Sequence, residues 1–467
     1  MNKSSSRVKN EARHTALLIV YDVLEKGAYA NLSLDKHMEK SKLAVDDRHL
    51  VTEIVNGTIR MLKHLDWVLN AFLPKPVEGQ NPWLRNILRI SVYQMLFMER
   101  IPDYAVVDSA VDLTNARLGR KLGGVVNGVL RNLARNRERI VYPDPGESKT
   151  FLSVYYSQPE WLVEMWLKDY GPEATRNMLA YLNQSPRVTL RYNQLISSRA
   201  ELQAQLKGEG VSTVLSSQTP WGLTVTGMDA SLGSLQAYRE GRFYVQNEGS
   251  MLAVAILDPH PGEHLIDLCS GVGGKATFMA EMIHDRGQID AIELHPHKVS
   301  LLKDNCSRLK ISSVTAFQQD ILQLSPGSFR GSGVLLDAPC SGLGVLNRRA
   351  DMRWRRTREE IEDLSRLQAG LLQIASDMVQ PGGRLVYTTC TIARPENQAV
   401  VESFLASNDD FSLEDFSSGL GFFPLDEGDR HQASQGMLCL LPGKYQTDGM
   451  FFARMRRSGH IKDGNEA

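Results

Sequence analysis

Short apolar segments alternate with stretches of helical character from about Gly241 onward. The apolar segments are His264–Leu268, Gly287–Ile292, Val314–Gln318, Gly333–Leu336 and Gly383–Tyr387. Apolar runs of this length are typical of strands buried on both faces, and their alternation with helices indicates a parallel sheet between helical layers. The sequence therefore predicts a doubly wound α/β domain over residues 241–457.

The first 141 residues show no strand pattern. Their apolar residues recur at helical spacing, as in Leu84, Ile87, Leu88 and Val92, and this spacing predicts an all-α domain over residues 1–141. The breakers of Tyr142–Lys149 indicate a linker. Residues 150–240 mix helical and strand-like runs, which predicts a small α+β domain between the two larger ones.

Composition excludes several classes of protein. The chain has 467 residues, of which 42% are hydrophobic and 23% charged, as in ordinary globular proteins of several domains. No stretch is apolar and long enough for a signal peptide or a membrane span, so we expect a cytoplasmic protein without membrane contact. The five cysteines are widely spaced and include no CxxC pair, so neither a disulfide framework nor a metal site is expected.

Positive charge is concentrated in the helical third. Residues 1–140 hold 22 Lys and Arg against 15 Asp and Glu, whereas the rest of the chain is net acidic. Seven basic residues and one acidic residue lie between Leu113 and Arg139, around an expected turn at Gly123–Gly128. This pattern fits a solvated helix face or a surface that contacts phosphates, with Arg131 and Arg135 as candidates.

A glycine-rich loop follows the first predicted strand of the α/β domain. It consists of Cys269, Ser270, Gly271, Val272, Gly273, Gly274 and Lys275. In a doubly wound sheet such a loop brings backbone N–H groups against a nucleotide-like cofactor, and Glu293, 22 residues after Gly271, could accept hydrogen bonds from ribose. The pattern is compatible with NAD and with S-adenosylmethionine. Asp320, after the third strand, is a weaker candidate for the adenine, because such residues often cap turns.

Two cysteines follow predicted strands at the edge where a ligand is expected. Cys340 lies in Asp337-Ala338-Pro339-Cys340-Ser341-Gly342, and Cys390 lies in Tyr387-Thr388-Thr389-Cys390-Thr391. A lone cysteine is more often an inert core residue. The polar, turn-forming neighbours of Cys340 instead place it beyond its strand, in reach of a shared pocket.

A thiol pair of this kind suits methylation at carbon 5 of cytosine. Carbon 5 is a poor nucleophile, and a thiolate that adds to carbon 6 converts the ring into an enamine able to attack an activated methyl group. Asp337 could stabilise the adduct near ring N3. The second cysteine could assist release, and spacing and chemistry alone accept either cysteine as the attacker.

These motifs resemble the bacterial small-subunit rRNA cytosine-5 methyltransferases of the Sun/Fmu type, within the wider family that includes the Nop2 proteins. Asp337–Gly342 is similar to the fourth motif of that family, and Thr389–Thr391 followed by Pro395-Glu396-Asn397 to the sixth. Gly241–Glu248 and Thr447–Phe452 resemble the segments that open and close its catalytic domain. The first 140 residues resemble the NusB-type helical RNA-binding fold.

The resemblance implies a role for each motif. Cys390 would be the nucleophile, Cys340 would aid product release, and Asp337 would contact cytosine N3. The cofactor would be S-adenosylmethionine in a Rossmann-like domain, bound by residues 269–275, Glu293, Asp320 and Asp337. Ser270-Gly271-Val272 replaces the usual Ala-Ala-Pro, which adds backbone freedom, and Glu293 replaces a frequent aspartate.

Six arginines surround one tryptophan shortly after Cys340. From this segment we expect Arg348, Arg349, Arg353, Trp354 and Arg355 to contact RNA by phosphate binding and base stacking, with a solvated helix start as the alternative.

The resemblance implies that the partner is small-subunit ribosomal RNA, before full assembly of the particle, and the protein is expected to act as a monomer. The target base would be unpaired or flipped out of its stack. Two other classes stay open on the sequence. They are a non-catalytic RNA-binding or antitermination factor, suggested by the NusB-like third, and an NAD-dependent oxidoreductase, allowed by the glycine loop.

Overall fold

The computed structural model describes residues 3–146, 148–228 and 230–459. Its contacts divide the chain into two compact units. The first unit comprises Met1–Ser185 and Leu346–Arg355, and the second comprises Pro186–Val345 and Arg356–Ala467. The chain therefore returns to the first unit for ten residues within the second half of the sequence. No helix among the described residues is long and apolar enough to cross a membrane.

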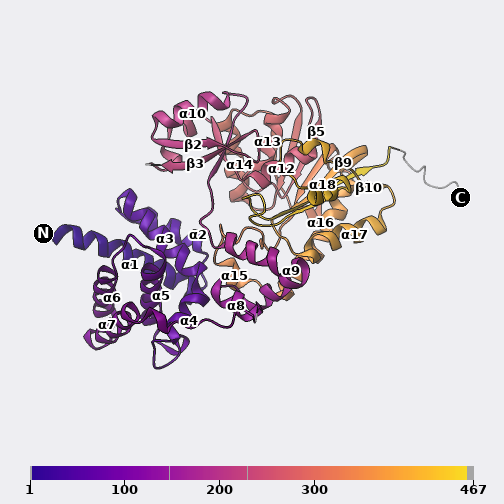
Figure 1. Cartoon of the computed structure of the whole chain (residues 1–467). Helices are drawn as coiled ribbons and strands as arrows, with labels where there is room; N and C mark the ends of the chain where they lie inside the picture. The colour runs from indigo at the N-terminus through magenta and orange to yellow at the C-terminus, as the bar shows by residue number, and fades with distance from the viewer. Residues whose placement is uncertain (1–2, 147, 229, 460–467) are drawn as a thin grey trace. The chain divides into compact units, whose positions relative to one another are not determined.

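The first unit is helical, as predicted (Figure 1). Its helices are α1 (Lys3–Lys26), α2 (Ala30–Lys40), α3 (Val45–Arg60), α4 (Leu62–Asn70), α5 (Pro82–Phe97), α6 (Asp103–Leu118), α7 (Arg120–Arg135), α8 (Ser148–Tyr155), α9 (Glu160–Leu182) and α15 (Met352–Arg355). Helix α5 is central, because it contacts α1, α3, α4, α6 and α7 and buries most of its residues. Its start follows the expected chemistry: Pro82 occupies the first turn, and the Asn81 side chain accepts from the N–H of Trp83 at 2.9 Å.

The expected turn at Gly123–Gly128 is wrong, because α7 runs through it without a break. The chain turns earlier, at Gly119, whose φ of 87° suits glycine. Gly123 instead permits a close helix contact, since a Cβ there would lie 2.1 Å from the Asn115 side-chain oxygen of α6. The glycines of this segment therefore allow close packing of a helix and do not mark a turn.

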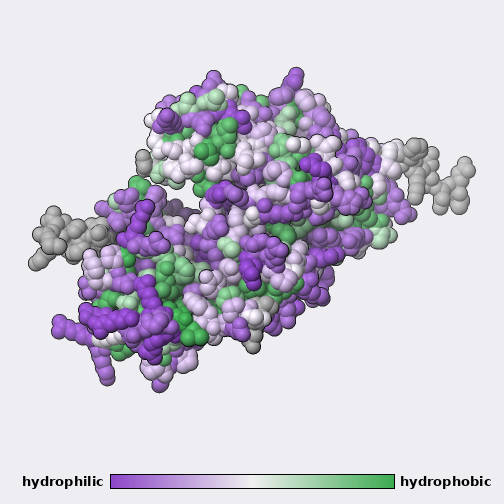
Figure 2. Space-filling model, viewed as in Figure 1, coloured by the Kyte–Doolittle hydropathy of each residue, from purple (hydrophilic) through white to green (hydrophobic). Residues whose placement is uncertain are grey.

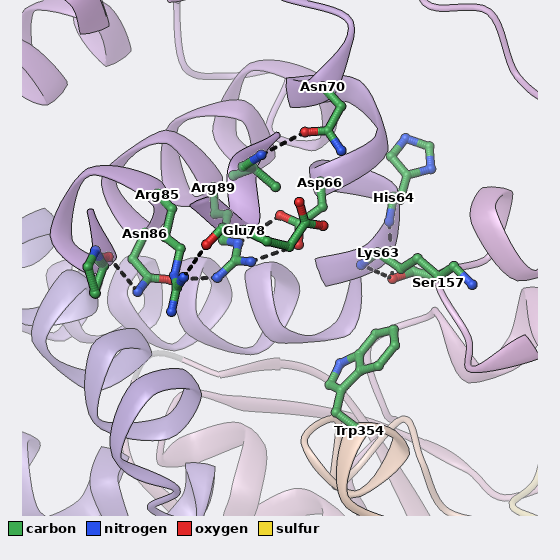
Figure 3. A network of polar contacts seen from close by, with 12 residues as sticks. Lys63, His64, Asp66, Asn70, Glu78, Arg85, Asn86, Arg89, Ser157 and Trp354 are labelled. Carbon is green, nitrogen blue, oxygen red and sulfur yellow. Dashed lines mark hydrogen bonds and ion pairs between the residues drawn. The ribbon is translucent and has the colours of Figure 1, made fainter. Parts of the chain in front are cut away.

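A polar network crosses the interior of this helical unit (Figure 3). Arg89 of α5 donates two hydrogen bonds of 2.7 Å to the Asp66 carboxylate, and Asn86 donates to Glu25 at 2.7 Å. Lys63 donates to the Ser157 hydroxyl through its backbone N–H at 3.0 Å, which links α4 to the residues that follow α8. Helices α8 and α9 are thereby held in the same unit as α1–α7.

The second unit begins with a small antiparallel sheet. Its elements are β1 (Thr189–Tyr192), α10 (Arg199–Gly208), β2 (Val211–Leu215), β3 (Gly222–Met228), α11 (Gln236–Arg239) and β4 (Phe243–Val245). The strand order is β2-β3-β1-β4, and the apolar side chains of one face form a core with α10 and α11. The α+β character predicted for this region is confirmed.

The larger sheet has the order β10-β12-β9-β8-β5-β6-β7, with β11 beside β12. Its strands are β5 (His264–Leu268), β6 (Gln288–Glu293), β7 (Val314–Gln318), β8 (Gly331–Asp337), β9 (Val379–Thr389), β10 (Phe411–Leu413), β11 (Met437–Leu440) and β12 (Met450–Arg457). The five strands predicted from the sequence are parallel to one another, and the three C-terminal strands are antiparallel additions.

Helices cover both faces of this sheet (Figure 1). They are α12 (Glu248–Leu257), α13 (Gly274–Met282), α14 (Pro296–Leu309), α16 (Arg358–Asp377), α17 (Gln398–Ser407) and α18 (Glu427–Ser434). Helices α12, α13 and α14 share an apolar core with Leu265, Leu335 and Val386 of the sheet. The alternate residues of β8 and β9 face α16. The predicted α/β architecture is confirmed, and the carboxyl ends of β8, β5, β6 and β7 lie side by side.

Candidate active site

Cys340 and Cys390 lie at the ends of two adjacent parallel strands. Strands β8 and β9 are paired in register, with Asp337 opposite Thr388, so the loops that follow them leave the sheet together. The two Sγ atoms are 3.2 Å apart, and both residues are of intermediate exposure. Residues separated by 50 positions in the sequence thus form a single thiol pair at the carboxyl edge of the sheet.

Backbone hydrogen bonds hold the two cysteine loops against each other. The N–H of Ala338 donates to the Thr388 carbonyl at 2.9 Å, and the N–H of Gly344 donates to the Cys390 carbonyl at 3.0 Å. Gly344 must be glycine for this approach, because a Cβ there would lie 2.1 Å from the Gly449 carbonyl oxygen. The loop after Cys340 is therefore pressed directly onto the Cys390 loop.

The buried carboxylate of Glu396 holds the loop that contains Cys340. Its Oε1 accepts from the Ser341 N–H at 2.8 Å and from the Gln368 amide at 3.0 Å, and its Oε2 accepts from the Ser341 hydroxyl. Glu396 has no solvent exposure. We did not assign it a role from the sequence, although it belongs to the Pro395-Glu396-Asn397 motif that follows Cys390.

The Cys340 thiol is held in its protonated form. Its hydrogen bond with Cys390 raises the pKa of Cys340 well above the usual thiol value, and burial and the Cys390 and Glu396 charges act in the same direction. Cys340 is thus suited to hold or donate a proton rather than to attack as a thiolate.

Asp337 is paired with Lys275 of the glycine loop. The Lys275 Nζ lies 2.5 Å from Asp337 Oδ2. Burial opposes the lysine charge, but the neighbouring carboxylates of Asp337 and Asp267 outweigh it and raise the pKa of Lys275. The structure therefore brings the predicted cofactor loop and the predicted thiol site together through a charged pair.

The glycine loop has the backbone needed for close approach of a ligand. Cys269, Gly271 and Gly273 all have positive φ, of 59°, 58° and 88°. Glu293, at the end of β6, accepts from the Gly271 N–H at 2.9 Å through one oxygen and from the His295 N–H at 2.9 Å through the other. Within the described chain the buried Ser270 hydroxyl has no hydrogen-bond partner. The loop, with an acidic residue on the next strand, fits the adenosine and ribose of a nucleotide-like cofactor.

Asp320 lies beyond the end of β7, next to β6 in the sheet. Its carboxylate accepts from the Leu322 N–H at 3.0 Å and from the Gln323 amide at 3.1 Å. These are the contacts of a helix cap, the alternative recognised from the sequence. A cap still leaves lone pairs on both oxygens, and the side chain is partly exposed.

Asp267 is a further acidic residue that we did not assign a role from the sequence. It lies in β5 with no solvent exposure, and neither carboxylate oxygen has a hydrogen-bond partner among the described residues. Burial raises the pKa of Asp267 to about 8, although Lys275 acts in the opposite direction. A charged residue inside the apolar run His264–Leu268 was the available signal.

The prediction for Arg353 is wrong in this structure, because its side chain is fully buried inside the first unit. Its guanidinium donates to the carbonyls of Arg60 and Ser157 at 3.1 and 3.2 Å, and to the Asn183 side chain at 2.9 Å. A guanidinium enclosed by acceptors of its own unit is not available to a phosphate.

Trp354 and Arg355 are also engaged by the first unit. The Trp354 indole N–H donates to the Ile59 carbonyl at 2.7 Å, and its ring packs against the helical core (Figure 3). Arg355 donates to the Gly27 carbonyl at 3.1 Å and lies over the Tyr29 ring. Trp354 therefore has a packing role in this unit, and because it is partly exposed, base stacking on it stays a prediction. Arg348 and Arg349 are exposed.

Basic side chains gather on α6 and α7 of the first unit. Figure 2 shows a mostly hydrophilic surface over these helices. Seven exposed basic residues occupy them and the turn that follows: Arg117, Arg120, Lys121, Arg131, Arg135, Arg137 and Arg139. Arg137 forms an ion pair with Asp103 at 2.8 Å, and Arg131 and Arg135 are exposed on α7.

Three family models match successive parts of the chain. Residues 10–135 match the NusB family, residues 158–230 match the ferredoxin-like domain of RsmF/B-like methyltransferases, and residues 254–456 match the 16S rRNA methyltransferase RsmB/F model.

Relatives match over nearly the whole length. The probable ribosomal RNA small subunit methyltransferase B of Synechocystis sp. is 34% identical, over 96% of this chain and 99% of its own. The chain belongs to the RsmB/F methyltransferase family. The corresponding protein of Bacillus subtilis is 33% identical over 97% of this chain and all of its own. Among solved structures, the crystal structure of PH0851 is similar with a TM-score of 0.76 and 26% identity, covering 96% of this chain and 99% of the other.

Membership of the RsmB/F family confirms the resemblance seen in the motifs and the three-part fold of helical, ferredoxin-like and methyltransferase regions. It also argues against the oxidoreductase and the non-catalytic antitermination factor, since the thiol pair and the glycine loop are both present in a methyltransferase framework.

Proposed function

We propose that this RsmB/F family member transfers a methyl group from S-adenosylmethionine to carbon 5 of a cytosine in small-subunit ribosomal RNA. The observation that carries the proposal is the 3.2 Å contact between the Cys340 and Cys390 thiols, beside the pair of Asp337 and Lys275. Covalent cytosine-5 chemistry requires one thiol for attack, and a second thiol beside it can assist release. The relatives are named for methylation of ribosomal RNA of the small subunit, which supports the substrate.

In this mechanism Cys390 is the nucleophile. Its thiolate forms a bond to carbon 6 of cytosine, and the electrons of the 5,6 double bond move to carbon 5. The Lys275 ammonium interacts electrostatically with Cys390 and would favour the thiolate. Asp337 would stabilise the adduct by a hydrogen bond in which its carboxyl group and ring N3 share a proton.

S-adenosylmethionine, held by residues 269–275, Glu293 and Asp320, would supply an activated methyl group and leave as a neutral thioether. Loss of the carbon 5 proton to water then returns an electron pair to the 5,6 bond and expels the Cys390 sulfur as a thiolate. Cys340, which keeps its proton in the free enzyme, would assist this elimination by donating a hydrogen bond to the departing thiolate. Cys390 is thereby regenerated and the methylated base is released.

RNA binding in this proposal is assigned to the basic surface of α6 and α7, including Arg131 and Arg135, and to the exposed Arg348 and Arg349. A ribosomal RNA substrate would place the enzyme in the cytoplasm, where it would act as a monomer on RNA that is not yet fully assembled with protein.

The test combines two single variants. Cys390→Ala should abolish methyl transfer and leave S-adenosylmethionine binding intact, and Cys340→Ala should accumulate a covalent protein–RNA adduct on denaturing gels. An adduct in the Cys390 variant instead would reverse the two roles. Bisulfite sequencing of ribosomal RNA from a deletion strain would identify the cytosine, and an unchanged pattern would count against an rRNA substrate.

A further inference from the structure

One charged side chain of the small sheet, that of Arg191, packs against helix α13 of the larger sheet. Arg191 lies in β1, where its neighbour Leu190 packs into the core of the small sheet. Successive residues of a strand point to opposite faces, so Arg191 points away from that core. Its side chain is nevertheless fully buried, against helix α13.

The Arg191 guanidinium lies along one face of α13. It donates to the Gly274 carbonyl at 2.7 Å, to the Thr277 hydroxyl at 3.1 Å and to Glu281 Oε1 at 2.7 Å. These acceptors are three and four residues apart, which is the spacing of one helix face. The Nε also donates to Glu281 Oε2 at 3.2 Å, so arginine engages both ends of the helix at once.

A buried ion pair alone does not explain this arrangement. Arg191 and Glu281 both have side chains with no exposure, and desolvation of such a pair often cancels its attraction. Burial raises the pKa of Glu281 to about 7 in spite of the arginine beside it. The pair therefore contributes little stability of its own. The planar guanidinium of Arg191 also reaches a second acceptor, the Gly274 carbonyl.

Gly274 is where the glycine loop becomes α13. Its carbonyl accepts from Arg191 and also from the Gln246 amide at 3.1 Å. The opposite side of the loop is held by Glu293, which accepts from Gly271. The next residue after Gly274 is Lys275, which bonds Asp337. The loop is thus fixed from one side by its own sheet and from the other by the small sheet.

We propose that Arg191 is a positioning residue for the cofactor site, through which the ferredoxin-like region completes the S-adenosylmethionine loop. This inference rests on the proposed function. It gives the small sheet a task in cofactor binding, in addition to any contact with RNA.

The decisive variant is the double substitution Arg191→Met with Glu281→Met. It removes both buried charges together, so neither is left unpaired and the fold is expected to persist. The Gly274 carbonyl loses Arg191 and keeps the side-chain donors Gln246 and Thr277. Calorimetry should show S-adenosylmethionine affinity reduced about tenfold, as expected for one lost hydrogen bond to an ordered loop. The KM for the cofactor should rise accordingly, with kcat at saturating cofactor largely retained.

Two further variants separate positioning from charge neutralisation. Glu281→Gln keeps the Arg191 bond to Gly274 and should bind cofactor like the wild type. Arg191→Lys keeps a cation for Glu281 but has no fork to reach Gly274 as well, and should lose affinity about as much as the double variant. If the double variant does not fold, the cofactor affinity of Arg191→Lys tests the inference.

A control removes a partly buried ion pair of the same unit, by Arg384→Met with Glu263→Met, at the ends of the strands opposite the glycine loop. Its cofactor affinity should equal that of the wild type. Wild-type affinity in folded Arg191→Met/Glu281→Met protein would overturn the inference and leave the proposed function standing. Absence of S-adenosylmethionine binding by the wild type would instead refute the proposed function.

Discussion

The Glu396 carboxylate accepts hydrogen bonds from both the backbone N–H and the hydroxyl of Ser341, the residue that follows Cys340. Through these hydrogen bonds, the Pro395-Glu396-Asn397 motif that follows Cys390 determines the position of Cys340. The Gln368 amide and the Ser341–Thr391 hydroxyl contact of 2.8 Å extend the same network. The spatial relation of the two thiols therefore depends in part on Glu396.

Replacing Glu396 with Ala should lower the free energy of unfolding by about 3 kcal/mol, because several buried donors lose their acceptor. Methyl transfer should fall more than stability explains, since the Cys340 loop loses its anchor. Urea unfolding and initial rates at a temperature where the variant is folded would measure both. Glu402→Ala, on the exposed face of α17, is the control and should change stability by no more than about 0.5 kcal/mol. Equal rates for Glu396→Ala and the wild type would contradict the prediction.

The reactivity of Cys340 should depend on Cys390. The hydrogen bond with Cys390 is the largest cause of the raised pKa of Cys340, so this thiol carries little thiolate near neutral pH. Cys390→Ala removes that partner and should lower the Cys340 pKa toward its usual value. Alkylation of Cys340 by iodoacetamide at pH 8, followed by mass spectrometry, should therefore be faster in the variant. Slower or unchanged labelling would show that Cys390 does not hold the Cys340 proton.

Arg353→Met should destabilise the helical unit. The substitution leaves buried carbonyls and the Asn183 side chain without their donor, at a cost of about 3 kcal/mol or more. RNA affinity of the folded variant should be unchanged, because Arg353 is enclosed. Arg349→Ala is the exposed control from the same segment and should keep wild-type stability. Salt-dependent RNA binding lost in Arg353→Met, with stability intact, would restore the original prediction for this residue.

The parallel core of the α/β fold was predictable because its strands are apolar on both faces, which leaves a local pattern in the sequence. The same reasoning placed Cys340 and Cys390 at one sheet edge. The antiparallel strands β10, β11 and β12 were not predicted. Strands β10 and β11 are only three and four residues long, too short to leave a clear pattern, and β10 pairs with β12 across all the residues that form α18 and β11.

The arginine segment shows what local composition does not reveal. Arg349 and Arg353 are four residues apart in the same basic stretch, yet one is exposed and the other is fully buried. The difference comes from carbonyls near residues 60, 157 and 182, which fold around Arg353. Acceptors that distant leave no trace in the segment itself, so charge density alone suggested phosphate contacts.

Asp267 should make stability depend on pH. Burial raises its pKa from the ordinary carboxyl range to about 8, so the folded state binds a proton more tightly than the unfolded state. The free energy of unfolding should consequently fall as the pH rises from about 4 to about 8, by at most about 1.4 kcal/mol per pH unit. Asp267→Asn carries no charge and should flatten this dependence. Urea titrations at pH 6 and pH 8 would measure the change, with the exposed Asp304→Asn as control. Identical slopes in wild type and Asp267→Asn would mean that Asp267 keeps an ordinary pKa.

The basic surface of α7 should account for part of the RNA affinity. Arg131 and Arg135 are four residues apart on one exposed helix face, so a single RNA backbone could contact both. Each phosphate contact with single-stranded RNA contributes about 0.7 to the slope of log affinity against log salt. The double variant Arg131→Ala/Arg135→Ala should therefore bind rRNA fragments more weakly and lower that slope by about 1.4. Lys207→Ala/Lys303→Ala removes two exposed charges of the second unit and serves as the matched control. Filter binding from 50 to 300 mM salt would measure the RNA affinity and its salt dependence. Equal slopes in the two double variants would mean that RNA binds elsewhere on the protein.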